Sequence, residues 1–140
     1  MNSAGARIAR RAADDGWERT GREVVVAGSM GPTGELFAPM GALDYDDAYA
    51  AFTAQATALA EGGVDMLWVE TMSSLEEVKA AIDAAAATGL PVAACMTFDT
   101  AAKTMMGVSP AEFAIQSAGF GAGFVGANCG IGPAELLHSV

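Results

Sequence analysis

The sequence predicts an α/β fold in which helices cover a parallel sheet. Short apolar runs alternate with amphipathic segments of helical periodicity along the 140 residues. Continuous apolar runs of about four to six residues are typical of strands that are buried on both faces, as the strands of parallel sheets are. Glycine or polar residues follow each run, and a helix signal comes next. This repeating strand–helix order favours a sheet whose strands all run in one direction.

The first two expected elements are a helix over residues 4–15 and a strand over residues 24–27. In the helix, small and apolar residues recur at four-residue spacing, and Gly16 and Gly21 are expected to end it. The strand is a continuous apolar run, and a glycine-rich segment, residues 28–34, follows it. That segment lacks the Gly-Lys-Ser/Thr ending of a phosphate-binding loop, so phosphate binding there is the weaker interpretation.

The next strand, over residues 64–69, leads to an acidic residue. It follows a helix expected over residues 46–61, which Asp44 or Asp46 can cap. Glu70 ends the strand, where an unpaired carboxylate would be costly. Either a substrate ammonium group or the start of the following helix could offset that cost.

Capping-box spacing marks the start of the helix that follows Glu70. Ser73 with Glu76, or Ser74 with Glu77, has the required serine and glutamate three residues apart. Gly89 is expected to close this helix, and the third strand covers residues 91–96.

The last expected strand, over residues 123–127, is an apolar run predicted to be buried. A helix precedes it and opens on residues 109–112, a capping box with proline at the first helical position. Asn128 and Cys129 lie where the strand ends, and Pro133 begins one more helix.

Two parallel architectures fit this order of elements: a (β/α)8 barrel and an open doubly wound sheet. Four polar or glycine-rich ends gathered on one rim are what the mouth of a barrel would present. A barrel takes about 250 residues and eight strands, however, and this chain has 140 residues and four expected strands. Both architectures stay open on this evidence. If the fold is a barrel, residues 1–140 form a partial (β/α)8 barrel, about half of the whole, as a single incomplete domain.

Composition excludes several classes of function. The net charge of −10 argues against binding to nucleic acid and to anionic membrane surfaces. No run approaches the roughly 20 apolar residues of a spanning helix, and the first residues carry no secretory signal. Two cysteines, Cys95 and Cys129, do not make a disulfide framework. A cytoplasmic location is the expectation.

Three residues toward the end of the sequence have roles that the sequence pattern alone does not decide. A thiol at a strand end, as at Cys129, can be a metal ligand, a nucleophile or a buried structural residue. Asn128 can orient ligands or simply form a turn. His138 follows two leucines on the last helix and is expected to be surface or core filler.

Four segments in order resemble the homocysteine S-methyltransferase family, in particular its betaine–homocysteine methyltransferase branch and the homocysteine domain of cobalamin-dependent methionine synthase. They are GSMGPTG at 28–34, GVDMLWVET at 63–71, MTFD at 96–99 and GANCGIGP at 126–133. The resemblance covers essentially the whole chain.

The resemblance implies a (β/α)8 barrel of which this chain supplies strands 3 to 6, and a methyl transfer that converts homocysteine to methionine. It implies Zn²⁺ held by three cysteine thiolates, with Cys129 as the first ligand. It places Glu70 on the amino group of homocysteine and Asn128 beside the substrate. The other implied partner is a small methyl donor: betaine is favoured, and S-methylmethionine or a methyl-corrinoid are alternatives.

The sequence departs from the family pattern in its metal ligands. The family's other two zinc ligands are an adjacent Cys-Cys pair, and this sequence has none. The Asp-Gly segment of the family's first strand is missing too. The chain is therefore expected to be an internal fragment that is inactive alone. The alternative is a non-catalytic half-barrel that self-associates or complements another half through its edge strands.

Overall fold

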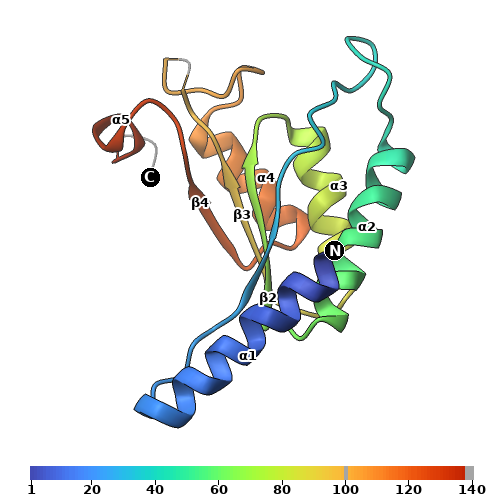
Figure 1. Ribbon diagram of the computed structural model, residues 1–140. Coiled ribbons are helices and arrows are strands. Elements are labelled where there is room, and N and C mark those ends of the chain that lie inside the picture. The colour runs from blue at the N-terminus through green and yellow to red at the C-terminus, as the bar shows by residue number, and fades with distance from the viewer. Residues whose placement is uncertain (100, 138–140) are drawn as a thin grey trace.

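A computed structural model describes residues 1–99 and 101–137, which form alternating helices and strands (Figure 1). The helices are α1 (Asn2–Thr20), α2 (Tyr45–Glu61), α3 (Leu75–Ala86), α4 (Pro110–Phe120) and α5 (Pro133–Leu137). The strands are β1 (Ala27–Met30), β2 (Met66–Met72), β3 (Val92–Met96) and β4 (Phe124–Ala127).

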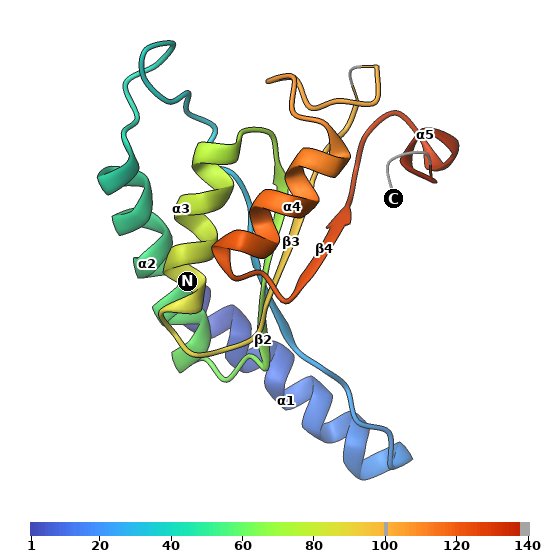
Figure 2. The same cartoon turned by 180° about the vertical axis from the view of Figure 1, so that it is seen from behind.

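The four strands make one parallel sheet in the order β1-β2-β3-β4. Helices α2, α3 and α4 lie together on one side of this sheet, as Figure 2 shows. Helix α1 packs against α2 near the end from which the strands start. The prediction of an α/β fold with parallel strands and alternating helices is therefore confirmed.

The hydrophobic core lies between the sheet and helices α2 to α4. Alternate residues of β2 point into it, so Leu67 and Val69 are fully buried while Trp68 between them is 37% exposed. Methionines end the first three strands and are also fully buried: Met30, Met72 and Met96. One side of the sheet is thus packed, and the other carries the more exposed residues of β1, β2 and β4.

The helix starts follow the capping patterns in the sequence. Asp44 caps α2 by accepting from the Asp47 backbone N–H at 2.9 Å. Ser74, and not Ser73, caps α3, because its hydroxyl accepts from Glu77 N at 3.2 Å. Ser109 does the same for α4, with Pro110 in the first turn. His138 lies outside the described residues.

The first helix and the first strand differ from the prediction. Helix α1 spans Asn2–Thr20 and so continues through Gly16. It stops at Gly21, the second of the two predicted glycines, where a φ of 67° and an N–H bond to Trp17 O end the helix. Strand β1 starts at Ala27, and not at residue 24. The Val26 N–H is occupied by the Asp65 carboxylate at 2.7 Å, so ladder pairing begins one residue later, at Ala27.

The second and fourth strands also differ. Strand β2 runs past Glu70 to Met72, with its register against β3 shifting between Val69 and Met72. Strand β4 was predicted to be buried, but Phe124 and Val125 are exposed because β4 is the edge of the described sheet. Within the described part of the chain, none of the helices combines the length and apolar character that a membrane crossing needs.

Candidate functional site

Polar side chains from three strand ends meet at the carboxyl edge of the sheet. Glu70 lies near the end of β2, and its carboxylate accepts a hydrogen bond from the Ser29 hydroxyl of β1. Its other oxygen, Oε2, accepts from Asn128 Nδ2 at 3.2 Å, just after β4. Both carboxylate oxygens are therefore oriented by neighbours, although Glu70 is only partly buried.

Asn128 is the residue that joins the strand ends. Its Oδ1 accepts from the Thr71 backbone N–H at 2.9 Å, and its Nδ2 donates to Thr71 Oγ1 at 2.7 Å. The same Nδ2 lies 3.6 Å from Cys129 Sγ. The Asn128 backbone is held as well, since its carbonyl accepts from Thr97 Oγ1 at 3.1 Å. One amide group thus connects Glu70, Thr71 and Cys129.

Thr71 and Cys129 share an unusual backbone conformation. Their φ angles are 63° and 59°, in the left-handed region that residues with a Cβ seldom occupy. Strain of this kind persists only where surrounding contacts hold it, and it gathers at functional sites. At these two residues Thr71 Oγ1 lies 3.8 Å from Cys129 Sγ, and Cys129 is exposed.

Cys95 has a different environment. It lies inside β3 with 4% of its surface exposed. Burial, together with the negative charge of Glu70, raises the pKa of the Cys95 thiol, and a hydrogen bond with the Trp68 side chain lowers it in part. This thiol stays protonated and buried, so it is not a candidate ligand or nucleophile.

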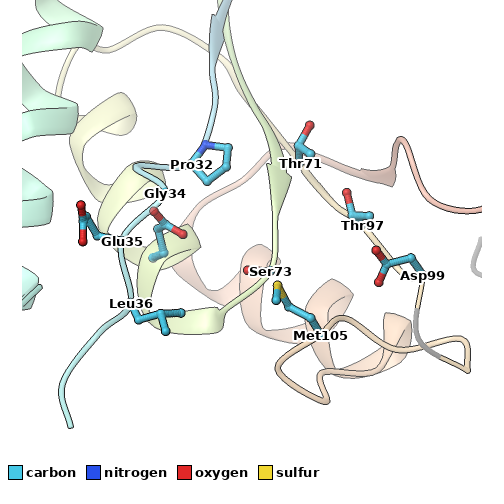
Figure 3. Close-up of a pocket in the computed structure, with 10 residues that line it drawn as sticks. Pro32, Gly34, Glu35, Leu36, Thr71, Ser73, Thr97, Asp99 and Met105 are labelled. Carbon is cyan, nitrogen blue, oxygen red and sulfur yellow. The ribbon is translucent and has the colours of Figure 1, made fainter. Parts of the chain in front are cut away.

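An open cavity of about 350 Å³ lies beside these strand ends (Figure 3). Thr71 and Thr97 line one side, and Gly34, Glu35 and Leu36 of the β1–α2 loop line another. Asp99 adds a carboxylate to the lining. Because Thr71 also contacts Cys129 Sγ, a molecule in this cavity would lie close to the thiol. The acidic lining suits a ligand that carries positive charge.

A family model described as Homocysteine S-methyltransferase matches residues 1–140. The chain belongs to the homocysteine S-methyltransferase family.

Curated relatives agree with this membership of the homocysteine S-methyltransferases. The chain is 33% identical over 144 residues to methionine synthase of Mycobacterium tuberculosis, a match that covers 97% of this chain and 12% of that protein. It is 31% identical over 140 residues to betaine–homocysteine S-methyltransferase 1 of Mus musculus, which covers 100% of this chain and 32% of that protein. The chain therefore spans a minor part of the length of these relatives.

Solved structures show the same fold. The apo crystal structure of the homocysteine methyltransferase MmuM from Escherichia coli matches with a TM-score of 0.79 at 20% identity, over 99% of this chain and 55% of that chain. The metallated form of MmuM matches with a TM-score of 0.54 at 17% identity, over 96% of this chain and 67% of that chain. The four-stranded sheet and its helices thus match about half of the fold of that E. coli protein.

The metal-binding side chains of this chain show whether its described residues could hold zinc without further ligands. Zinc in proteins takes three or four nitrogen, sulfur or carboxylate ligands. No group of three His, Cys, Asp or Glu side chains placed to hold a metal occurs among residues 1–99 and 101–137. Cys129 is an exposed residue whose sulfur is of the soft type that zinc accepts. The described residues do not complete a zinc site by themselves.

The structure brings together the three residues predicted from the sequence, Glu70, Asn128 and Cys129. Sequence reasoning did not single out Ser29 or Thr71. Both lie in segments that carry the resemblance to the homocysteine S-methyltransferases, next to a strand end, and that position was the signal available for them.

Proposed function

We propose that this chain forms the homocysteine-binding part of a zinc-dependent methyltransferase, and that the transfer yields methionine. The observation that supports it most is the shared amide of Asn128, which orients the Glu70 carboxylate and lies beside the Cys129 sulfur. The carboxylate suits the ammonium group of homocysteine, and a zinc ion held by the Cys129 sulfur would lie near the sulfur at the other end of that substrate.

Glu70 is proposed to bind the ammonium group. Ser29 and Asn128 both donate to its carboxylate, which fixes the direction of its remaining lone pairs. A bond between ammonium and carboxylate is charge-assisted and is stronger than a neutral hydrogen bond.

Cys129 is proposed to be one zinc ligand, with the other ligands provided by residues outside those described. When bound, zinc would keep the homocysteine sulfur deprotonated, and therefore nucleophilic, at neutral pH. In the chain itself, the left-handed turn at Cys129 and Gly130 presents the sulfur at the rim, and Asn128 Nδ2 lies within 3.6 Å of it.

The cavity beside Thr71 is proposed to take the methyl donor. Glu35 and Asp99 line it, and their negative charge favours a donor whose methyl group is bound to a cationic centre, such as betaine. The homocysteine sulfur forms a bond to the methyl carbon, while the bond from that carbon to the donor nitrogen breaks and leaves its electron pair on the nitrogen. The nitrogen of the donor therefore loses its positive charge and leaves as a tertiary amine.

The test uses protein expressed from the complete open reading frame that contains these residues. Methionine formation is measured with betaine, S-methylmethionine and a methyl-corrinoid as donors. We expect turnover with betaine, a large loss in Glu70→Gln and Cys129→Ser, and little change in the matched control Cys95→Ser. Full activity in Cys129→Ser would refute the proposal.

A second candidate is a non-catalytic chain that pairs with another polypeptide. The exposed Phe124 and Val125 on the edge strand β4 favour it, because an unpaired apolar edge is a template for strand addition. Sedimentation of the 140-residue chain tests this candidate. Stable dimers of this chain, together with no methyl transfer by the protein from the complete open reading frame, would support it over the enzyme.

A further inference from the structure

Glu77 is a buried carboxylate whose hydrogen bonds reach far along the sequence. It lies in the first turn of α3 with 3% of its surface exposed. Its Oε1 accepts from the Thr33 backbone N–H at 2.8 Å and from the Thr33 hydroxyl at 2.7 Å. A carboxylate leaves water only where such donors compensate it. Glu77 therefore ties the start of α3 to the β1–α2 loop.

Helix capping alone does not account for this side chain. In a reciprocal capping box the glutamate carboxylate returns to the backbone N–H of the capping serine. Here Ser74 accepts from Glu77 N, but the Glu77 carboxylate goes to Thr33 instead. Helix α4 provides the comparison: Ser109 accepts from Glu112 N at 3.3 Å, and Glu112 is exposed.

The loop that Glu77 holds forms one wall of the cavity beside the thiol. Gly34, Glu35 and Leu36, which follow Thr33 directly, line that cavity (Figure 3). Glu77 lines it as well. Thr71, on the other side, is within 3.8 Å of Cys129 Sγ. The width of the cavity therefore depends on where Thr33 is held.

We infer that Glu77 is a positioning residue, which holds Thr33 so that residues 31–36 form the wall of the methyl-donor pocket. This inference rests on the proposed function, because that function assigns the cavity to the donor. Glu77 acts here as a hydrogen-bond acceptor and transfers no proton. Either a carboxylate or an amide oxygen can accept both bonds from Thr33, so Glu77→Gln should preserve the role and Glu77→Ala should remove it.

The experiment compares four variants in the protein from the complete open reading frame: Glu77→Ala, Glu77→Gln, Thr33→Val and, as the matched control, Glu112→Ala. Thr33 is exposed, so its variant tests the contact without disturbing the core. Hydrogen–deuterium exchange of peptides over residues 31–36 reports whether the loop is held. Steady-state kinetics report the KM for the methyl donor, the KM for homocysteine and kcat separately.

We expect Glu77→Ala to speed hydrogen–deuterium exchange over residues 31–36 and to raise the donor KM about tenfold. The reason is that the two hydrogen bonds that hold Thr33, and with it the wall of the donor pocket, are lost. The homocysteine KM should stay within about twofold, because Glu70 keeps its own partners. Thr33→Val should show a smaller rise of the donor KM. Glu77→Gln and Glu112→Ala should behave as wild type.

Unchanged loop exchange in Glu77→Ala, or an unchanged donor KM in both Glu77→Ala and Thr33→Val, would overturn the inference. So would an equal rise of both KM values. A wild-type protein without methyl transfer would refute the proposed function and, with it, the assignment of the donor pocket. Loop exchange would then still decide whether Glu77 holds residues 31–36.

Discussion

The two cysteines of this chain lie in regions with opposite physical character. Cys95 is in the middle of β3, 4% exposed, with a pKa raised by burial. Cys129 follows the end of β4, is exposed, and has left-handed backbone geometry. Asn128 Nδ2 and Thr71 Oγ1 lie 3.6 Å and 3.8 Å from its sulfur. The thiol within the strand is therefore buried, and the residue that follows the strand end is exposed.

The difference shows what prepares a sulfur for chemistry in this fold. Parallel strands place their carboxyl ends at one edge, where loops provide polar neighbours and access. The polar contacts of Glu70, Thr71 and Asn128 all lie at that edge. Proximity to the rim, and not the identity of the residue, therefore separates a candidate ligand from a packing residue.

The largest expected difference between the two cysteines is in their rates of alkylation. In metal-free protein, iodoacetamide should modify Cys129 at least about a thousandfold faster than Cys95, because a buried thiol reacts only when the structure opens locally. Peptide mapping by mass spectrometry over time measures both rates in one sample. Comparable rates would mean that Cys95 is accessible in solution.

Glu70→Gln should have the next largest effect. Loss of the charge is expected to raise the KM for homocysteine about a hundredfold, as truncating one side of a close charge pair does. A homocysteine analogue without the amino group should bind the two proteins alike, which isolates the ammonium contact. Glu76→Gln, in an exposed position nearby, is the matched control. An equal loss for the analogue would place the ammonium group elsewhere.

Asn128→Asp should lower the stability of the protein, because it disrupts the hydrogen bonds around Cys129. The surroundings of Cys95 should stay unchanged. The substitution removes the donors to Thr71 Oγ1 and Glu70 Oε2 and sets two carboxylates face to face. A loss of about 2 kcal/mol in the free energy of unfolding is expected. Urea denaturation measures it, with Asn128→Ala separating lost bonds from repulsion. A variant as stable as wild type would show that the amide does not connect the strand ends.

Cys95→Ala should have the smallest effect on stability, and that effect should depend on pH. The pKa of the Cys95 thiol is raised above the ordinary 9.0, so the unfolded chain loses this proton at lower pH than the folded chain. The contribution to stability is therefore complete below about pH 9 and is lost as pH rises through the raised pKa. Cys95→Ala should cost about 1 kcal/mol at pH 7 for the lost packing.

Above about pH 9 the difference in unfolding free energy between wild type and Cys95→Ala should shrink, because only wild type loses the thiol contribution. Denaturation at pH 7, 9 and 10 checks this. A gap that widens with pH would reverse the assigned direction.

Much of the fold could be predicted from the sequence because local signals agree with the tertiary structure. Ser109 is the predicted cap of α4, Asp44 and Ser74 are each one of the two caps that the sequence allows, and the strand–helix alternation is correct. The start of β1 could not be predicted, because it depends on a hydrogen bond from the Val26 N–H to the side chain of Asp65, which lies just before the neighbouring strand. The exposure of β4 follows from its place at the edge, which an apolar run does not encode.

The candidate site divides in the same way. Glu70, Asn128 and Cys129 stand out in the sequence because each follows an apolar strand. The contact from Ser29 to Glu70, and that from Glu77 to Thr33, join residues distant in sequence and appear only when the strands pair. Closure into a complete (β/α)8 barrel and the zinc role of Cys129 stay predictions.

Metal content tests the central claim, that the exposed sulfur at the strand end is a zinc ligand, most directly. The protein from the complete open reading frame, its Cys129→Ser variant and its Cys95→Ser variant are purified identically and assayed for zinc by mass spectrometry. The account predicts about one zinc per chain in wild type and in Cys95→Ser, and a loss of most of it in Cys129→Ser. Equal zinc in all three proteins would contradict it.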